Sequence, residues 1–127
     1  MGTGDAVRKT ILLVDDHAGF RAFARKFLES EGFDVVGEAA DGAAAIDAAR
    51  ALLPDAMLLD VQLPDIDGFE VTRQVLERAE APPAVVLVSS REAKDFGDRV
   101  HSSGARGFIP KVELSGSALH ALLAEAP

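Results

Sequence analysis

Four apolar runs of this sequence end on polar residues that could do chemistry. The residues at or just beyond these ends are Asp15, Asp16, Asp60, Ser89, Ser90 and Lys111. The carboxyl ends of parallel strands lie at one edge of a sheet, where open α/β sheets bind their ligands. If the runs are neighbouring parallel strands, three carboxylates, two hydroxyls and one amine converge on one small cleft.

The carboxylates of this group predict a cation site. Three clustered carboxylates repel one another, and a hard divalent cation with oxygen ligands relieves that repulsion. In a shallow site that handles phosphate, this cation is expected to be Mg²⁺. Asp16 and Asp60 would bind it directly, the backbone carbonyl of Gln62 would be a further ligand, and Asp15 would act through water.

Asp60 is the candidate nucleophile. A carboxylate beside Mg²⁺ can attack a phosphoryl group and form an acyl phosphate, with one oxygen left for the metal. Lys111 would then neutralise, together with the metal, the charge that develops on the transferred oxygens. Ser89 supplies a hydroxyl at the end of the neighbouring run. The pattern therefore predicts phosphoryl transfer to an aspartate.

Each of these residues also has an ordinary structural explanation. The Asp15–Asp16 pair could cap a helix N-terminus, because Asp accepts hydrogen bonds from free backbone N–H groups there. Asp60 could start a loop, the Ser89–Ser90 pair could cap the next helix, and Lys111 could be a solvated lysine. These explanations are weaker together than singly, because all four would have to coincide at one end of one sheet.

Alternating strand and helix patterns must position these side chains. Short β-rich runs predict strands over residues 10–14, 35–39, 56–59, 84–88 and 107–109. Apolar residues at helical spacing predict a helix after each strand. The five predicted helices carry, in order, Phe20, Phe23, Ala24, Phe27 and Leu28; Ala45, Ile46, Ala49 and Leu53; Val71, Val75 and Ala79; Ala93, Phe96 and Val100; and Leu119, Leu122 and Leu123.

Five βα units predict a doubly wound α/β fold. Strands that read as continuous apolar runs are typical of a parallel sheet covered on both faces. The flavodoxin-like (βα)5 class, with strand order 2-1-3-4-5, is the doubly wound order that needs only five strands. Pro110 at the end of the last run favours an edge strand. The fourth helix has the weakest apolar face and should be among the less stable elements.

Length and composition limit the possible classes of protein. The 127 residues fit one domain over 1–127, with a core of about 9–124 and no output domain. A net charge of −8 disfavours direct contact with nucleic acid. The chain has no cysteine and no apolar run near the roughly 20 residues of a membrane span, and its first nine residues do not resemble a signal peptide. These features predict a cytoplasmic protein.

The motifs ILLVDDH, LLDVQLPDIDG, VVLVSS and GFIPK, in this order and spacing, resemble the receiver domain of bacterial two-component response regulators. The resemblance covers nearly the whole chain, from about Lys9 to Leu123. The stretch VVGEAADG is similar to receivers of the NarL/FixJ-like branch, which are usually joined to a helix-turn-helix DNA-binding output.

The resemblance implies a role for each site residue. Asp60 would be the phospho-acceptor, the Asp15–Asp16 pair the metal-binding acids, and Lys111 the lysine that binds the phosphoryl group. Ser89 would be the switch hydroxyl and Phe108 the switch aromatic. A sensor histidine kinase or histidine phosphotransfer protein would donate the phosphoryl group, and the surface of the fourth helix, fifth strand and fifth helix would change and could mediate a homodimer.

Some positions depart from the family pattern or vary within it. Val112 follows Lys111 where receivers often have proline, so the loop before the last helix is expected to differ in shape. Phe108 cannot donate the hydroxyl hydrogen bond of a tyrosine. Gln62 and Arg91 resemble the variable positions that tune how readily water reaches the acyl phosphate, although both could be plain exposed loop residues. The three histidines are expected at the surface.

Two other functions remain open from the sequence. A phosphatase of the haloacid-dehalogenase type also uses a strand-end aspartate with Mg²⁺, but it needs a second acid two residues on, where this chain has Gln62. A pseudo-receiver would be an interaction module that never takes phosphate. Turnover of phosphate esters would favour the phosphatase, and a lack of Mg²⁺ binding would favour the pseudo-receiver.

Overall fold

A computed structural model describes residues 8–78 and 80–124 of the chain. Its centre is one five-stranded parallel sheet in the order β2-β1-β3-β4-β5. The strands are β1 (Thr10–Val14), β2 (Asp34–Ala39), β3 (Ala56–Asp60), β4 (Ala84–Ser89) and β5 (Gly107–Pro110). The predicted fold class and strand order are confirmed, and Pro110 lies on an edge strand.

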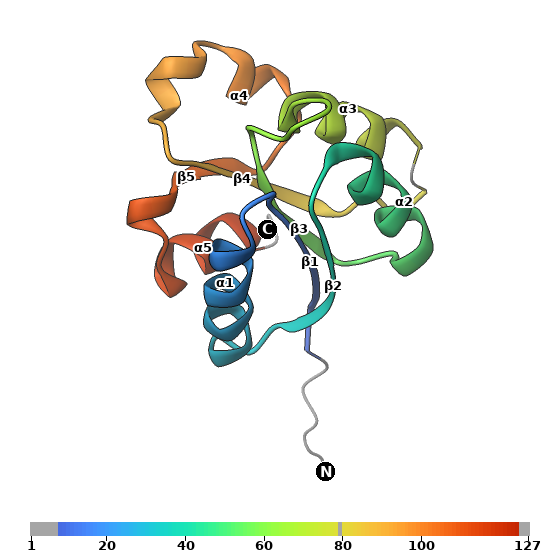
Figure 1. The fold of residues 1–127 in the computed structure, drawn as a ribbon, viewed down its shortest axis with the longest axis vertical. Coiled ribbons are helices and arrows are strands. Elements are labelled where there is room, and N and C mark those ends of the chain that lie inside the picture. Colours follow the sequence, from blue (N-terminus) through green and yellow to red (C-terminus); the bar gives the residue numbers. More distant parts are fainter. Residues whose placement is uncertain (1–7, 79, 125–127) are drawn as a thin grey trace.

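Helices cover both faces of the sheet (Figure 1). They are α1 (Ala18–Ser30), α2 (Gly42–Leu52), α3 (Gly68–Arg78), α4 (Arg99–Ser102) and α5 (Gly116–Leu123), with short 3-10 helices over Ala93–Phe96 and Lys111–Glu113. Within the described ranges, no helix has the length and apolar character needed to cross a membrane.

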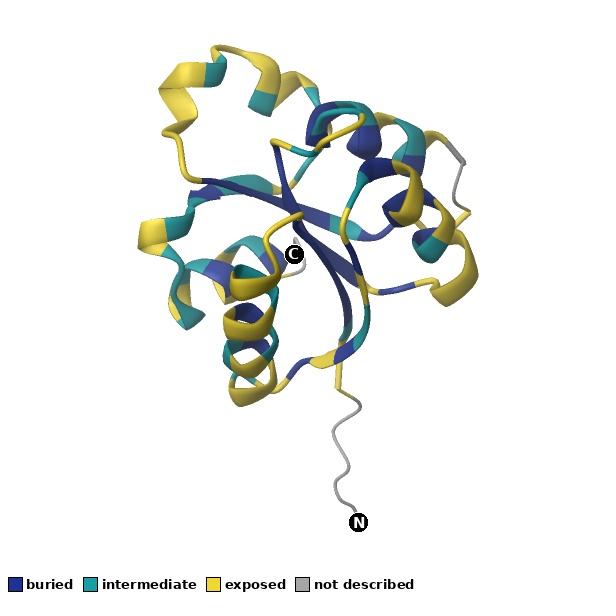
Figure 2. Cartoon of the chain, viewed as in Figure 1, coloured by how far each residue is buried: buried dark blue, intermediate teal, exposed yellow. Residues whose placement is uncertain are grey.

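The apolar core is divided by the sheet into two layers. Ile11 and Leu13 of β1 point to the side covered by α1 and α5, whereas Leu12 and Val14 point to the side covered by α2 and α3. This alternation is the two-residue period of a strand. Figure 2 shows the central strands buried along their length and the outer helix faces exposed. The sheet is therefore apolar on both faces, as its continuous apolar runs predicted.

The structure adds three details to the predicted helices. Leu53 does not lie on the core face of α2; it follows the helix with a left-handed φ of 48° and is 71% exposed. Phe23 fits the helical spacing of α1 but is 57% exposed. The helix predicted through Ala93, Phe96 and Val100 is divided, because Gly97 adopts a φ of +59° between the 3-10 helix and α4. Ala79, placed on the third helix, lies outside the described residues.

Gly68 allows α3 to begin directly against the end of β3. Its backbone N–H donates to the Val61 carbonyl at 2.7 Å. A Cβ atom at Gly68 would lie 2.5 Å from the Asp60 carbonyl oxygen and 2.9 Å from Val61 Cα, both backbone atoms that cannot turn away. Glycine is thus required at position 68 by close backbone approach rather than by a left-handed φ.

Replacing Gly68 by alanine should destabilise the protein by about 2 kcal/mol or more, because the backbone after Asp60 must move to admit a methyl group. Gly19→Ala is the matched control, since no heavy atom lies within 4 Å of a Cβ placed there. That change should be neutral or stabilise α1 by up to about 1 kcal/mol. Urea unfolding of the two variants checks this, and equal stabilities would contradict the close approach.

Candidate phosphoryl-transfer site

The connection from β1 to α1 holds Asp15 in the interior and Asp16 at the surface. Asp15 is fully buried, and its Oδ1 accepts a hydrogen bond from the His17 backbone N–H at 2.8 Å. His17, not an aspartate, is the residue before α1, and no side chain caps this helix. The helix-cap explanation for the Asp15–Asp16 pair is therefore wrong.

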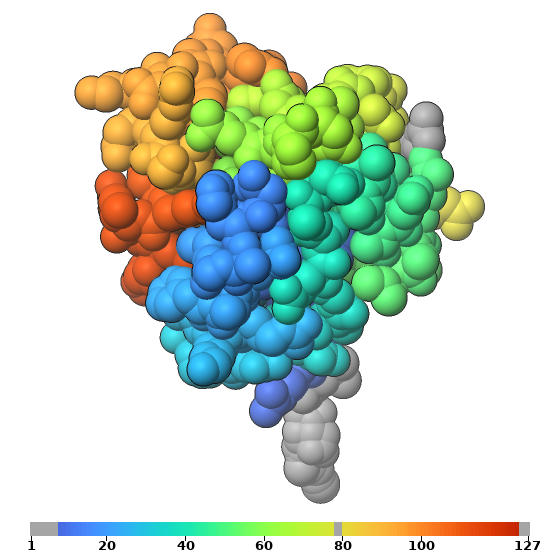
Figure 3. Space-filling view, in the orientation of Figure 1, coloured from blue at the N-terminus to red at the C-terminus, as the bar shows by residue number. Residues whose placement is uncertain are grey.

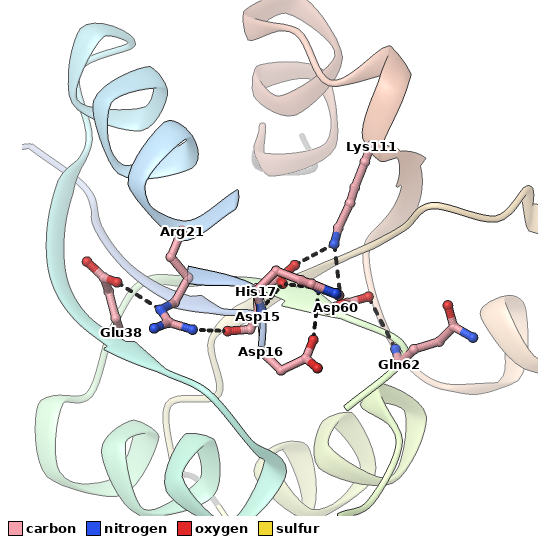
Figure 4. Close-up of polar contacts among 8 residues, drawn as sticks. All are labelled: Asp15, Asp16, His17, Arg21, Glu38, Asp60, Gln62 and Lys111. Atoms are coloured by element: carbon pink, nitrogen blue, oxygen red, sulfur yellow. Dashed lines mark hydrogen bonds and ion pairs between the residues drawn. The ribbon is translucent and has the colours of Figure 1, made fainter. Parts of the chain in front are cut away.

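Asp60 ends β3 as a buried carboxylate with only 3% of its surface exposed. Its Oδ1 accepts from the backbone N–H of Gln62 at 3.2 Å, and its Oδ2 lies 3.4 Å from Lys111 Nζ. The Gln62 side chain points away from the carboxylates (Figure 4). The loop that follows Asp60 thus fixes its carboxylate. The carboxylate faces the ammonium group of Lys111, which follows β5.

Lys111 bridges the two buried carboxylates. Its Nζ lies 2.6 Å from Asp15 Oδ2 as well as 3.4 Å from Asp60 Oδ2. The same ammonium group sits 4.4 Å from the centre of the Phe20 ring on α1, within cation–π range. Side chains at the carboxyl ends of β1, β3 and β5 therefore meet at one point, as the strand-end pattern predicted.

Burial and charge raise the pKa of Asp60. Removal of its carboxylate from water raises the pKa most, and the negative charge of Asp15 raises it further, to about 6. The Gln62 N–H and the Lys111 ammonium act in the opposite direction but do not cancel these effects. At neutral pH Asp60 is mainly ionised, but its ionisation is costly in the folded protein.

The donor atoms around Asp60 suit a divalent cation. Ligand atoms of Asp15, Asp16, His17 and Asp60 all lie within 4.8 Å of one another. Asp15 Oδ2 is buried and, among the described residues, accepts no hydrogen bond; its contact with Lys111 is an ion pair only. One ammonium group faces the carboxylates of both Asp15 and Asp60, and a cation would balance the negative charge that remains. The residues therefore fit the predicted Mg²⁺.

Ser89 and Phe108 lie on the two strands beyond β3. Ser89 is fully buried at the end of β4, and its Oγ accepts from the Arg91 backbone N–H at 3.1 Å. The next helical turn starts instead at Glu92, whose N–H donates to Asp95 Oδ2 at 3.0 Å, so the serine pair does not cap it. Phe108 of β5 is half-buried, with its ring centre 5.7 Å from that of Phe96.

Comparison with known proteins decides the family. The model of the response regulator receiver domain family matches residues 11–124, nearly the whole chain. The chain belongs to this family. Its fold is thus that of a receiver domain of two-component response regulators, as the motifs predicted.

Several relatives of this receiver are response regulators. Response regulator GacA of Pseudomonas aeruginosa is 39% identical over 102 residues, which are 80% of this chain and 47% of that protein. The NarL signal receiver domain of Mycobacterium tuberculosis superposes with a TM-score of 0.80 at 33% identity, covering 93% of this chain and 98% of that one. A LuxR-family regulator from Aurantimonas superposes at 0.82 with 30% identity, covering 92% and 86%. The chain spans about half the length of the curated relatives it matches.

The contacts of three residues around the receiver site were not predicted. Arg21 donates from Nη1 to the Asp15 carbonyl at 2.6 Å and from Nε to Glu38 of β2 at 3.1 Å. Asp65 accepts hydrogen bonds from the first two N–H groups of α2, which lowers its pKa. The imidazole of His17, expected as a plain surface residue, is exposed but lies 3.1 Å from Asp16 Oδ1. Only Arg21 had a sequence signal, because it lies one helical turn after His17.

Segments that are distant in sequence meet around this site at the surface. In Figure 3 the β1–α1 connection (blue), the segment after β3 (green) and the α4 region (orange) adjoin on one face. Asp16 is exposed there, while Asp60 lies below the surface. A phosphodonor could therefore approach Asp60 from this face, past the acidic pair.

The raised pKa of Asp60 predicts a pH-dependent stability. The folded state holds its proton more tightly than the unfolded chain, so stability should fall as pH rises from about 4 through 6. Asp60→Asn removes this loss. Without added divalent cation, the variant should gain on the order of 2 kcal/mol relative to the wild type between pH 4 and pH 7. Urea unfolding at a series of pH values measures the difference, and a difference that stays constant would contradict the pKa shift.

Proposed function

We propose that this receiver accepts a phosphoryl group on Asp60 from the phosphohistidine of a sensor histidine kinase or a histidine phosphotransfer protein. The observation that carries the proposal is the placement of Asp60. Its buried carboxylate ends a central strand, with Lys111 Nζ 3.4 Å away and the Asp15 carboxylate held by the same ammonium group. A carboxylate fixed in this setting can act as a nucleophile toward a phosphoryl group and form an acyl phosphate, while Lys111 pairs with the phosphoryl oxygens.

A Mg²⁺ ion is part of the proposal. Asp16, Asp60 and the Gln62 carbonyl would hold it, and Asp15 would act through water. The bound ion would neutralise negative charge on the phosphoryl oxygens beside Asp60. The family and the acidic cluster support this assignment.

The chain's own residues would perform the transfer as follows. An oxygen of Asp60 attacks phosphorus, the P–O bond forms, and the bond from phosphorus to the donor's imidazole nitrogen breaks. The ammonium group of Lys111 stays beside Asp60 and pairs with the oxygens of the transferred phosphoryl group. Because Asp60 has a pKa of about 6, its attacking form predominates at neutral pH.

The response to phosphorylation would begin at Ser89 and Phe108. Ser89 Oγ would give up its contact with the Arg91 N–H and donate to a phosphoryl oxygen. Phe108 would leave the Phe96 ring and turn inward. The surface of α4, β5 and α5 would then rearrange, and a partner or a second copy of the chain would bind it.

Two further roles complete the proposal. Gln62 and Arg91 are both exposed and flank the site, where they would tune the access of water to the acyl phosphate. The chain's net charge of −8 argues against direct contact with nucleic acid, so any such contact would need another domain. The receiver would act as a single domain over residues 1–127.

The rival functions fit the site less well. A pseudo-receiver needs none of the acidic cluster or the lysine, yet here these groups are assembled within a few ångströms. A haloacid-dehalogenase phosphatase needs an acid two residues after the nucleophile. That residue is Gln62, and its side chain points away from Asp60 (Figure 4).

Intact mass after incubation with Mg²⁺ and acetyl phosphate tests the proposal. The wild type should gain one phosphoryl group, and EDTA should prevent the gain. Asp60→Asn should show no gain while keeping its fold by circular dichroism. A folded wild type without an adduct would favour the pseudo-receiver, and an adduct on the variant would place the acceptor elsewhere.

Lys111→Met should slow adduct formation by about 100-fold, because the charge that develops on the phosphoryl oxygens loses its ammonium partner. Lys26→Met is the control, since Lys26 is an exposed lysine on α1. The rate of mass gain at fixed acetyl phosphate measures both. Equal rates for Lys111→Met and the wild type would remove Lys111 from the transfer step.

A further inference from the structure

His17 brings a nitrogen donor to the acidic cluster. Its Nδ1 lies 3.1 Å from Asp16 Oδ1 and 3.3 Å from Asp15 Oδ1, and Figure 4 shows the ring beside the carboxylates of Asp15, Asp16 and Asp60. The side chain is 73% exposed, so packing against the core does not explain the position of the ring. The backbone hydrogen bond from His17 to Asp15 Oδ1 holds the residue at this place.

The spacing of these atoms matches that of ligands on one ion. Two adjacent ligands of an octahedral cation with bonds of about 2.1 Å lie roughly 3 Å apart. The distance from His17 Nδ1 to Asp16 Oδ1 is 3.1 Å. The spacing therefore permits His17 Nδ1 and Asp16 Oδ1 to bind one ion.

A second observation points to a ligand at this place. Asp15 is fully buried, and its Oδ2 lies 2.6 Å from the Lys111 ammonium, which also faces Asp60 Oδ2 at 3.4 Å. One ligand atom from each of Asp15, Asp16, His17 and Asp60 lies within 4.8 Å of the others. The cluster thus has three carboxylates and one ammonium group, which leaves negative charge for a cation to balance beside the exposed imidazole.

A nitrogen donor changes which metal a site favours. Mg²⁺ is a hard cation that strongly prefers oxygen, whereas imidazole suits first-row transition metals such as Co²⁺, Ni²⁺ and Zn²⁺. We propose that His17 is a metal-specificity residue, which joins Asp16 and Asp60 as a ligand and lets the site bind a transition-metal dication in competition with Mg²⁺. The inference rests on the proposed function only for the location of the ion.

Metal titration tests the role of His17 directly. Calorimetry with MgCl₂, CoCl₂ and NiCl₂, on protein without a histidine tag, compares the wild type with His17→Asn. The variant should bind Ni²⁺ about tenfold more weakly or worse, and its Mg²⁺ affinity should change by less than about threefold. The loss should be smaller for Co²⁺ than for Ni²⁺, following the order in which these ions favour nitrogen ligands.

A matched control excludes binding of metal by any exposed histidine. His101 of α4 is also exposed, so His101→Asn should leave the Ni²⁺ affinity unchanged. An unchanged ratio of Ni²⁺ to Mg²⁺ affinity in His17→Asn would overturn the inference, and so would an equal loss in His101→Asn. Because His17 is exposed, neither variant should lose its fold, and circular dichroism checks this.

The outcomes also separate this inference from the proposed function. Suppose that the wild type takes no phosphoryl group, while His17→Asn binds Ni²⁺ more weakly than the wild type. This result would overturn the proposed function and support the metal role of His17. A wild type that is phosphorylated on Asp60 but binds Ni²⁺ independently of His17 would do the reverse.

Discussion

The site depends on one ion cluster, in which the ammonium group of Lys111 lies between the buried carboxylates of Asp15 and Asp60. Two carboxylates without a counter-charge could not both remain ionised in the interior. With one ammonium group between them the pKa of Asp60 is still raised to about 6, first by removal of its carboxylate from water and then by the charge of Asp15. The remaining negative charge makes the site receptive to a cation. The buried charges lower the stability of the folded protein, and they leave Asp60 as a reactive carboxylate.

The rest of the molecule holds these charges in place. β1 and β3 are apolar on both faces, so their backbones are fixed by packing and each ends on its aspartate at the same sheet edge. Arg21 supports the β1–α1 connection by donating a hydrogen bond to the backbone carbonyl of Asp15. Gly68 lets α3 start directly behind Asp60. The chemistry therefore lies on loops, while a rigid sheet determines their positions.

The segment between β4 and β5 differs from the rest of the molecule because it lacks a long helix. The element between β4 and β5 is a 3-10 turn and a four-residue α4 separated at Gly97, and its residues are mostly exposed. Arg99 ties this element to the loop after β3 through Asp67, at 2.6 Å, and lies over the Phe69 ring. A segment with few buried apolar contacts has low local stability and can rearrange at small cost. Its position beside Phe108 suits a region that responds to events at Asp60.

The sequence by itself determined the sheet, its order and the residues at its edge. Continuous apolar runs specify a parallel sheet, and because parallel strands end together, Asp15, Asp60 and Lys111 had to converge. Only the tertiary structure decided how these groups pair, since the distance from Lys111 to Asp15 depends on the packing of strands 96 residues apart in the chain. It also decided the left-handed end of α2 at Leu53, the break at Gly97, the capping of α2 by Asp65 and the position of the His17 ring. Backbone dihedrals and long-range side-chain contacts of this kind leave no periodic signal, because they depend on neighbours that only folding brings together.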